Sequence, residues 1–93
     1  MNADLSTEDV IRRGLAAARL LTDDTLTAVL AQIEAECAAA WAGSNPADVA
    51  TREDAYRMTR CVVLLRQKLE AWRGAAHVEQ NNVAWRLKEA RGG

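Results

Sequence analysis

The sequence has no phenylalanine, a single proline and a single histidine among its 93 residues. Three tryptophans and one tyrosine are the only large aromatic side chains available to anchor a core. A zinc site needs three or four converging Cys, His or carboxylate ligands. His77 has Glu70 and Glu79 nearby in sequence, but helical spacing does not gather the three on one face. We therefore expect no metal site.

Catalytic patterns are also missing. Nucleophilic catalysis needs a nucleophile whose base is oriented by a third group, and no spacing in the sequence predicts such a unit. The carboxylates of Glu34 and Glu36 point to different faces of a helix. No glycine-rich phosphate loop is present. We expect that the protein is not an enzyme and holds no cofactor.

Long hydrophobic runs are absent as well. No segment approaches the ~20 apolar residues that cross a bilayer, and the first four residues lack the basic and apolar regions of a signal peptide. Cys37 and Cys61 lie 24 residues apart and form no CxxC motif. We expect assembly in the cytosol without membrane contact, with both thiols buried and reduced. A disulfide between them is the alternative.

The sequence is rich in helix-forming residues, above all alanine. Hydrophobic residues make up 49% of the chain, and residues 16–18 and 38–40 are all alanine. Alanine favours helix strongly but contributes little buried apolar surface. A chain of this length forms one domain at most. Its thin core indicates stability gained from neighbours, either copies of itself or a larger assembly.

Charge is divided unevenly along the chain, although the net charge is −1. Residues 1–50 carry eight acidic residues and three arginines, a net −5, whereas residues 51–93 carry nine bases and five acids, a net +4. One interpretation is that the two halves fold onto each other. The other is a basic surface for an acidic partner or nucleic acid. We favour the first, and expect no nucleic-acid binding, because the bases form no dense cluster.

Start signals predict the first two helices. Ser6 is a good N-cap for the first helix, and Leu5 and Val10 can form a hydrophobic staple across that cap. Gly14 lies on the apolar stripe of this helix and can permit close approach of another helix. Residues 22–25 offer the cap of a second helix.

The connection to the third helix is the clearest loop in the sequence. Gly43 is placed to act as the C′ residue of the second helix, and residues 44–46 read Ser-Asn-Pro. We expect a turn at 46–50 and a third helix capped by Thr51. Without interruption to Ala90 this helix would be ~60 Å long, which is more than the first two helices can cover.

The third helix carries an apolar seam whose members are spaced by 4, 3, 4, 3 and 4 residues: Met58, Val62, Leu65, Leu69, Trp72 and Ala76. This spacing is typical of helix packing, so the seam is predicted to be the core. Arg52, Arg66 and Arg73 follow a heptad track that is predicted to be solvated. Gly74 is the expected weak point of the helix.

The C-terminal part of the chain repeats the tripeptide Ala-Trp-Arg at 71–73 and 84–86. Thirteen residues of helix rotate Trp85 by about 220° from Trp72, so Trp85 either anchors a second surface or folds back onto the first two helices. We predict an all-α fold, a helical hairpin or three-helix arrangement with an extended C-terminal helical tail. Residues 1–77 are expected to form the bundle and residues 78–93 an interaction arm. The candidate interface residues are Trp72, Trp85, Arg73, Arg86, Lys88 and Arg91.

A further pattern runs from about residue 12 to residue 72. It consists of Leu20, Leu21, Leu26, Ile33, Glu34, Trp41, a short loop with Pro46, then Thr51, Arg52, Glu53, Leu65, Leu69 and Glu70. This order resembles a group of short proteins encoded in structural gene clusters of tailed bacteriophages and prophages of Gram-negative bacteria. The residues after Ala75 depart from the pattern of that group.

The resemblance implies a bacteriophage virion structural protein without enzymatic activity, present in several copies and bound to the capsid, portal or tail. Its partners would be other phage structural proteins, copies of itself, or both, in an oligomer or head–tail assembly. The virion, assembled in the host cytoplasm, is its expected location. Two alternatives stay open: a small helical binding protein that inhibits or regulates a host partner, and an assembly scaffold or chaperone absent from the mature virion.

Overall fold

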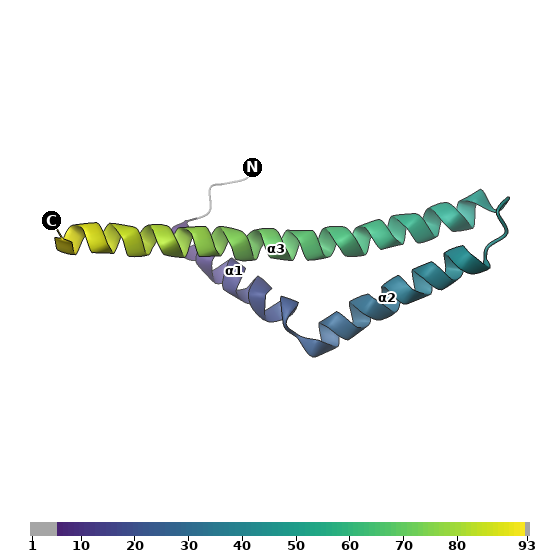
Figure 1. Cartoon of the computed structure of the whole chain (residues 1–93), viewed down its shortest axis with the longest axis horizontal. Coiled ribbons are helices and arrows are strands. Elements are labelled where there is room, and N and C mark those ends of the chain that lie inside the picture. The colour runs from purple at the N-terminus through teal and green to yellow at the C-terminus, as the bar shows by residue number, and fades with distance from the viewer. Residues whose placement is uncertain (1–5, 93) are drawn as a thin grey trace. The chain divides into compact units, whose positions relative to one another are not determined.

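The computed structural model describes residues 6–92 and is all-α, as predicted. Its three helices are α1 (Thr7–Leu21), α2 (Asp24–Gly43) and the long C-terminal α3 (Val49–Gly92) (Figure 1). The contacts divide these helices into two units. In the first, α1 packs on the part of α3 from Lys68 onward, and in the second, α2 packs on the part of α3 up to Gln67. The proposed functional boundary at residue 77 stays a prediction.

The first two helices begin with side-chain caps. The Ser6 hydroxyl accepts the backbone N–H of Asp9 at 3.1 Å, which confirms Ser6 as the cap of α1. Asp23 caps α2, because its carboxylate accepts the backbone N–H of Leu26 at 2.7 Å. Leu5, one partner of the expected staple, lies outside the described residues.

The end of α2 differs from the expected glycine cap. Gly43 belongs to the helix, and no described glycine has a positive φ. Ser44 ends the helix instead, since both its backbone N–H (3.2 Å) and its hydroxyl (2.7 Å) donate to the carbonyl of Trp41. Because Ser44 gives two donors to the Trp41 carbonyl, this helix end does not need a residue in the left-handed conformation to cap it.

The start of α3 also corrects the sequence prediction. Asp48, and not Thr51, is the cap: its carboxylate accepts the backbone N–H of Thr51 at 3.1 Å and the Thr51 hydroxyl at 2.7 Å. The helix therefore begins at Val49. Asn45 orders the preceding turn by accepting the backbone N–H of Ala47 at 2.8 Å. The two bonds from Thr51, the hydroxyl first and then the backbone, lower the pKa of Asp48 below its ordinary 3.8.

α3 runs without a break through Gly74, which was expected to weaken it. Its buried side chains recur every seventh residue: Ala55, Val62, Leu69 and Ala76. The predicted seam is thus correct at Val62, Leu69 and Ala76. It is wrong at Met58 and Leu65, which are 50% and 44% exposed. The covered side of α3 in the second unit carries Ala55, Thr59 and Arg66 instead, because α2 approaches from that side.

α1 and α3 approach each other closely at Gly14. Gly14 is buried, and a Cβ atom placed on it would overlap the Cβ of Ala76 and the carbonyl oxygen of Trp72. Ala17 and Ala76 are almost fully buried beside this contact. The expectation that Gly14 permits close approach of another helix is confirmed.

We predict that Gly14→Ala destabilises the protein by about 1–3 kcal/mol, the usual cost of overpacking, despite the higher helix propensity of alanine. Gly74→Ala is the matched control, because Gly74 is helical with open space around it. It should stabilise the protein by up to ~1 kcal/mol. Urea midpoints followed by circular dichroism measure both. Equal shifts of the same sign would contradict the close contact at Gly14.

We also predict that Asp48 titrates below 3.8 in the folded protein. Because the folded pKa is lowered, the contribution of Asp48 to stability is present above 3.8 and is lost as the pH falls through the folded value. Thr51→Val removes the hydroxyl donor and should move the Asp48 pKa back toward 3.8. Thr59→Val, the same change two turns later, should leave it unmoved. Carboxyl NMR titration distinguishes these outcomes.

Candidate protein-binding surface

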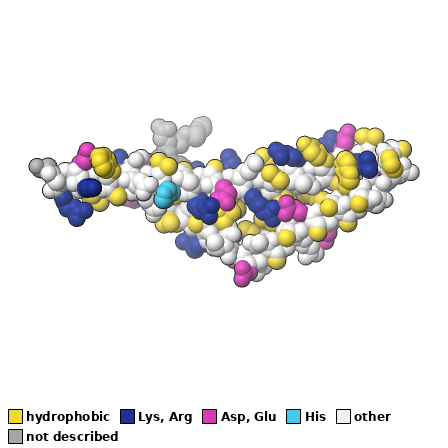
Figure 2. Space-filling view, viewed as in Figure 1, with side chains coloured by type: hydrophobic (Ala, Val, Ile, Leu, Met, Phe, Trp, Pro, Cys, Tyr) yellow, Lys and Arg dark blue, Asp and Glu magenta, His cyan; other side chains and the backbone are white. Residues whose placement is uncertain are grey.

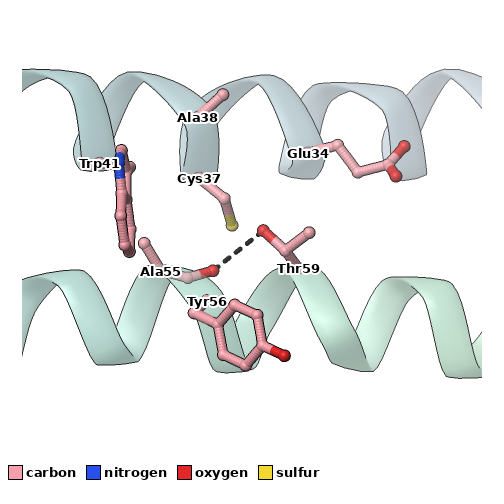
Figure 3. A pocket seen from close by; sticks show the side chains of 7 residues that line it. All are labelled: Glu34, Cys37, Ala38, Trp41, Ala55, Tyr56 and Thr59. Carbon is pink, nitrogen blue, oxygen red and sulfur yellow. Dashed lines mark hydrogen bonds between the residues drawn. The ribbon is translucent and has the colours of Figure 1, made fainter.

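A shallow groove of about 410 Å³ lies between α2 and α3 in the second unit (Figure 3). Two small buried side chains, Cys37 from α2 and Ala55 from α3, form its floor, and the exposed Ala38 lines it on α2. Trp41 and Tyr56 are much larger and rise at its edges. Figure 3 shows the Trp41 ring reaching from α2 toward α3 and the Cys37 sulfur pointing toward α3. The groove therefore arises where small residues let two helices lie close between bulky neighbours.

Arg52 holds one end of this groove. Its guanidinium lies 4.5 Å from the centroid of the Trp41 ring, and its Nε donates to the Ser44 hydroxyl at 2.9 Å. The first turn of α3 is thereby joined to the last turn of α2. A second hollow of about 320 Å³ lies beyond, with Trp41 and Tyr56 in its wall as well. These two side chains are thus shared by both hollows.

An ion pair lies at the other end. Arg66 donates to the carboxylate of Glu34 at 2.6 Å, and about one third of each side chain is exposed. The expectation of a solvated arginine track is therefore wrong at Arg52 and Arg66, which both contact α2. The physical reason is that α2 offers an aromatic ring and a carboxylate but no basic residue. Arg73, half exposed, pairs with Glu70 of its own helix.

Two polar side chains of the groove are already engaged. The Thr59 hydroxyl donates to the carbonyl of Ala55 at 2.9 Å, and Glu34 is bound by Arg66. The rest of the lining is mainly apolar. The opening between Trp41 and Tyr56 suits an apolar side chain of a partner protein.

The sequence-derived interface candidates all lie in the C-terminal part of α3. Trp72 is half-buried, and the Arg13 guanidinium of α1 stacks 4.1 Å from its ring centroid. Trp85 is 59% exposed, with the Lys88 ammonium 6.0 Å from its ring centroid. Arg86, Lys88 and Arg91 are exposed. Whether these residues bind a partner stays a prediction.

Contact between α1 and α3 extends at least as far as Glu79, whose carboxylate accepts the Thr7 hydroxyl at 3.0 Å. Trp85 lies six residues beyond, nearly two helical turns. Sequence reasoning missed Tyr56 and the joint role of Trp41 and Arg52. The only sequence signal for this arrangement was one aromatic residue on each side of the predicted loop, Trp41 before it and Tyr56 after it.

Titratable and metal-ligating groups are dispersed. Within residues 6–92, no three His, Cys, Asp or Glu side chains lie close enough to hold a metal ion. Both cysteines are free; Cys37 is buried as expected, but Cys61 is exposed, because it lies on the side of α3 that α2 leaves uncovered. None of the described helices is both long and apolar enough to span a membrane.

Many of the large hydrophobic side chains among the described residues are exposed. Twelve large hydrophobic side chains are exposed, whereas the large buried ones are Leu30, Val62 and Leu69. The space-filling view shows apolar side chains at the surface of α2 and of the first half of α3 (Figure 2). Comparisons with protein-family models, curated proteins and solved structures found no match.

We predict that Arg52→Ala lowers the free energy of unfolding by about 1–2 kcal/mol, because it removes a cation–π contact and a hydrogen bond. Arg52→Lys should recover only part of this loss, since a lysine cannot stack and donate in the same fork geometry. Arg57→Ala is the control: Arg57 is exposed and pairs only with Glu53 and Asp54 on its own helix among the described contacts. An equal effect of Arg57→Ala in urea unfolding would contradict the role given to Arg52.

Proposed function

We propose that this chain is a non-enzymatic helical subunit of a multi-copy protein assembly, and that it binds its neighbours through the apolar surface of α2 and α3. The observation that carries this proposal is the excess of exposed over buried large hydrophobic side chains. Exposed apolar surface of this extent is typical of proteins that are covered by a partner.

The proposed setting is the virion of a tailed bacteriophage, at the capsid, portal or tail, on the strength of the resemblance over residues 12–72. Apolar contact in the α2–α3 groove suits a structural role, since two of its polar side chains, Glu34 and Thr59, are engaged within the chain. A helical regulator of a host protein, or a scaffold that leaves before maturation, would use the same surface. The three roles differ in where the chain is found.

Mass spectrometry of purified particles tests this proposal. Stoichiometric presence of the chain is expected for a structural subunit. Presence in immature particles and loss on maturation would indicate a scaffold. Absence from both, with a host protein bound to the chain, would indicate a regulator and overturn the proposal.

We predict that Tyr56→Glu abolishes incorporation into particles, because it places a charge at the edge of the apolar groove. Its circular dichroism should match that of the unmodified chain, since Tyr56 is 60% exposed. Asp54→Asn is the control and should incorporate normally, because Asp54 is exposed, lines neither hollow and lies about 200° around α3 from Tyr56. Trp85→Ala tests the C-terminal arm in the same assay. Full incorporation of Tyr56→Glu would exclude the groove as the binding surface.

A further inference from the structure

The side of α3 that α1 covers in the first unit is apolar. Leu69 and Ala76, seven residues apart, are buried on this side. Gly14 packs directly on Ala76, and Thr7, the first residue of α1, donates to Glu79. Because lower numbers in α1 meet higher numbers in α3, the two helices run antiparallel. The first turn of α1 therefore lies near Glu79.

The same side of α3 stays apolar beyond this point, as Val83, Leu87 and Ala90. Val83 and Ala90 follow Ala76 at the same interval of seven residues, which brings each back to within about 20° of the last. Leu87 lies one turn from both. Val83 is half-buried, Leu87 is 58% exposed and Ala90 is exposed. We call these three residues the C-terminal stripe; it has the spacing of a helix-packing seam.

Two arginines border the C-terminal stripe. At about 100° per residue, Arg86 and Arg91 lie about 70° to either side of its centre. Both side chains are exposed, and neither has an ion pair or hydrogen bond with another described residue. Glu89 is the one acid of residues 80–92, and it lies about 130° from the centre. The charge beside the stripe is therefore positive and is not neutralised within the described chain.

We infer that the C-terminal stripe binds an acidic amphipathic helix of a partner protein. The inference rests on the proposed function and gives the chemistry of one partner. The partner is a helix because the stripe repeats every seven residues and continues a seam that α1 already occupies. It is acidic because carboxylates on the two flanks of its apolar side would meet Arg86 and Arg91.

The position of Trp85 argues against a lipid surface as the partner. This side chain is 59% exposed and lies about 170° from the centre of the stripe. Helices that lie in a membrane interface place tryptophan on the same face as their leucines, whereas a membrane that took up Leu87 would leave Trp85 in water. Single-stranded nucleic acid requires cations interleaved with aromatic rings, but an apolar stripe separates the two arginines.

Fluorescence anisotropy with a labelled synthetic peptide tests the inference on the full chain. The probe is an amphipathic helix with leucine at the seam positions of a heptad repeat and glutamate on both flanks. A second peptide carries lysine in place of every glutamate. The chain should bind the glutamate peptide, less tightly as salt is added, and should not bind the lysine peptide. Equal binding of the two peptides, or binding of neither, would overturn the inference.

Charge exchange locates the binding surface. Arg86→Glu combined with Arg91→Glu should weaken binding of the glutamate peptide by about tenfold or more, because two ion pairs are replaced by repulsion. The same double variant should gain binding of the lysine peptide. Lys88→Glu is the matched control, since it makes the same change of charge about 130° from the centre of the stripe. A loss of similar size in Lys88→Glu would show that only net charge matters.

Leu87→Ala tests the apolar contact and should weaken binding by about tenfold or more. Val78→Ala is its control: Val78 is 56% exposed, but nine residues of helix turn it about 180° away from Leu87. This control should bind like the unmodified chain. Because every altered side chain is exposed, circular dichroism should show the same helix content in all variants.

Vesicles of anionic lipid and a single-stranded oligonucleotide complete the experiment. Binding of either one, without binding of the glutamate peptide, would replace the acidic helix by that partner. None of these results decides the proposed function, which is tested by the presence of the chain in particles and by Tyr56→Glu. Peptide binding by a chain that is absent from particles would leave the inference standing and remove the proposed function.

Discussion

The helices of this protein meet across small side chains, and the rest of its structure depends on that constraint. In the first unit Gly14 and Ala17 of α1 lie against Ala76. In the second, Cys37 of α2 lies near Ala55. Small residues allow close backbones but remove little apolar surface from water. Leu30, Val62 and Leu69 are buried, but most of the other large hydrophobic side chains lie on the flanks of the helix pairs, where solvent reaches them.

Because the contact line is thin, polar and charged groups help to fix the helices. Asp48 and Ser44 define the ends of the α2–α3 connection, and Arg52 joins both sides of it through Trp41. Arg66 and Glu34 join the helices further along. Each of these interactions contributes modestly to the stability of the fold, but together they hold α2 on one side of α3. The other side of α3 is left uncovered as a consequence.

That one-sided packing links the structure to the proposed role. A chain that buries its large side chains completely has little to offer a partner, whereas this one keeps an apolar groove between α2 and α3 and exposed aliphatic side chains outside it. The proposed assembly would cover these surfaces. Stability and recognition would then come from the same surface, as in subunits whose folding is completed by association.

Local signals in the sequence determined the all-α class, the caps at Ser6 and within residues 22–25, the position of the loop, and the glycine contact at Gly14, because helix propensity and capping act over one or two turns. The heptad spacing also located Val62, Leu69 and Ala76. Only the tertiary structure decided that Met58, Leu65 and Cys61 face solvent and that Arg52 and Arg66 face α2. The seam of α3 has apolar residues on both flanks, so another helix could cover it from either side. The side that α2 covers depends on the Arg66–Glu34 pair and on the stacking of Arg52 on Trp41. Both interactions join residues that are far apart in the sequence.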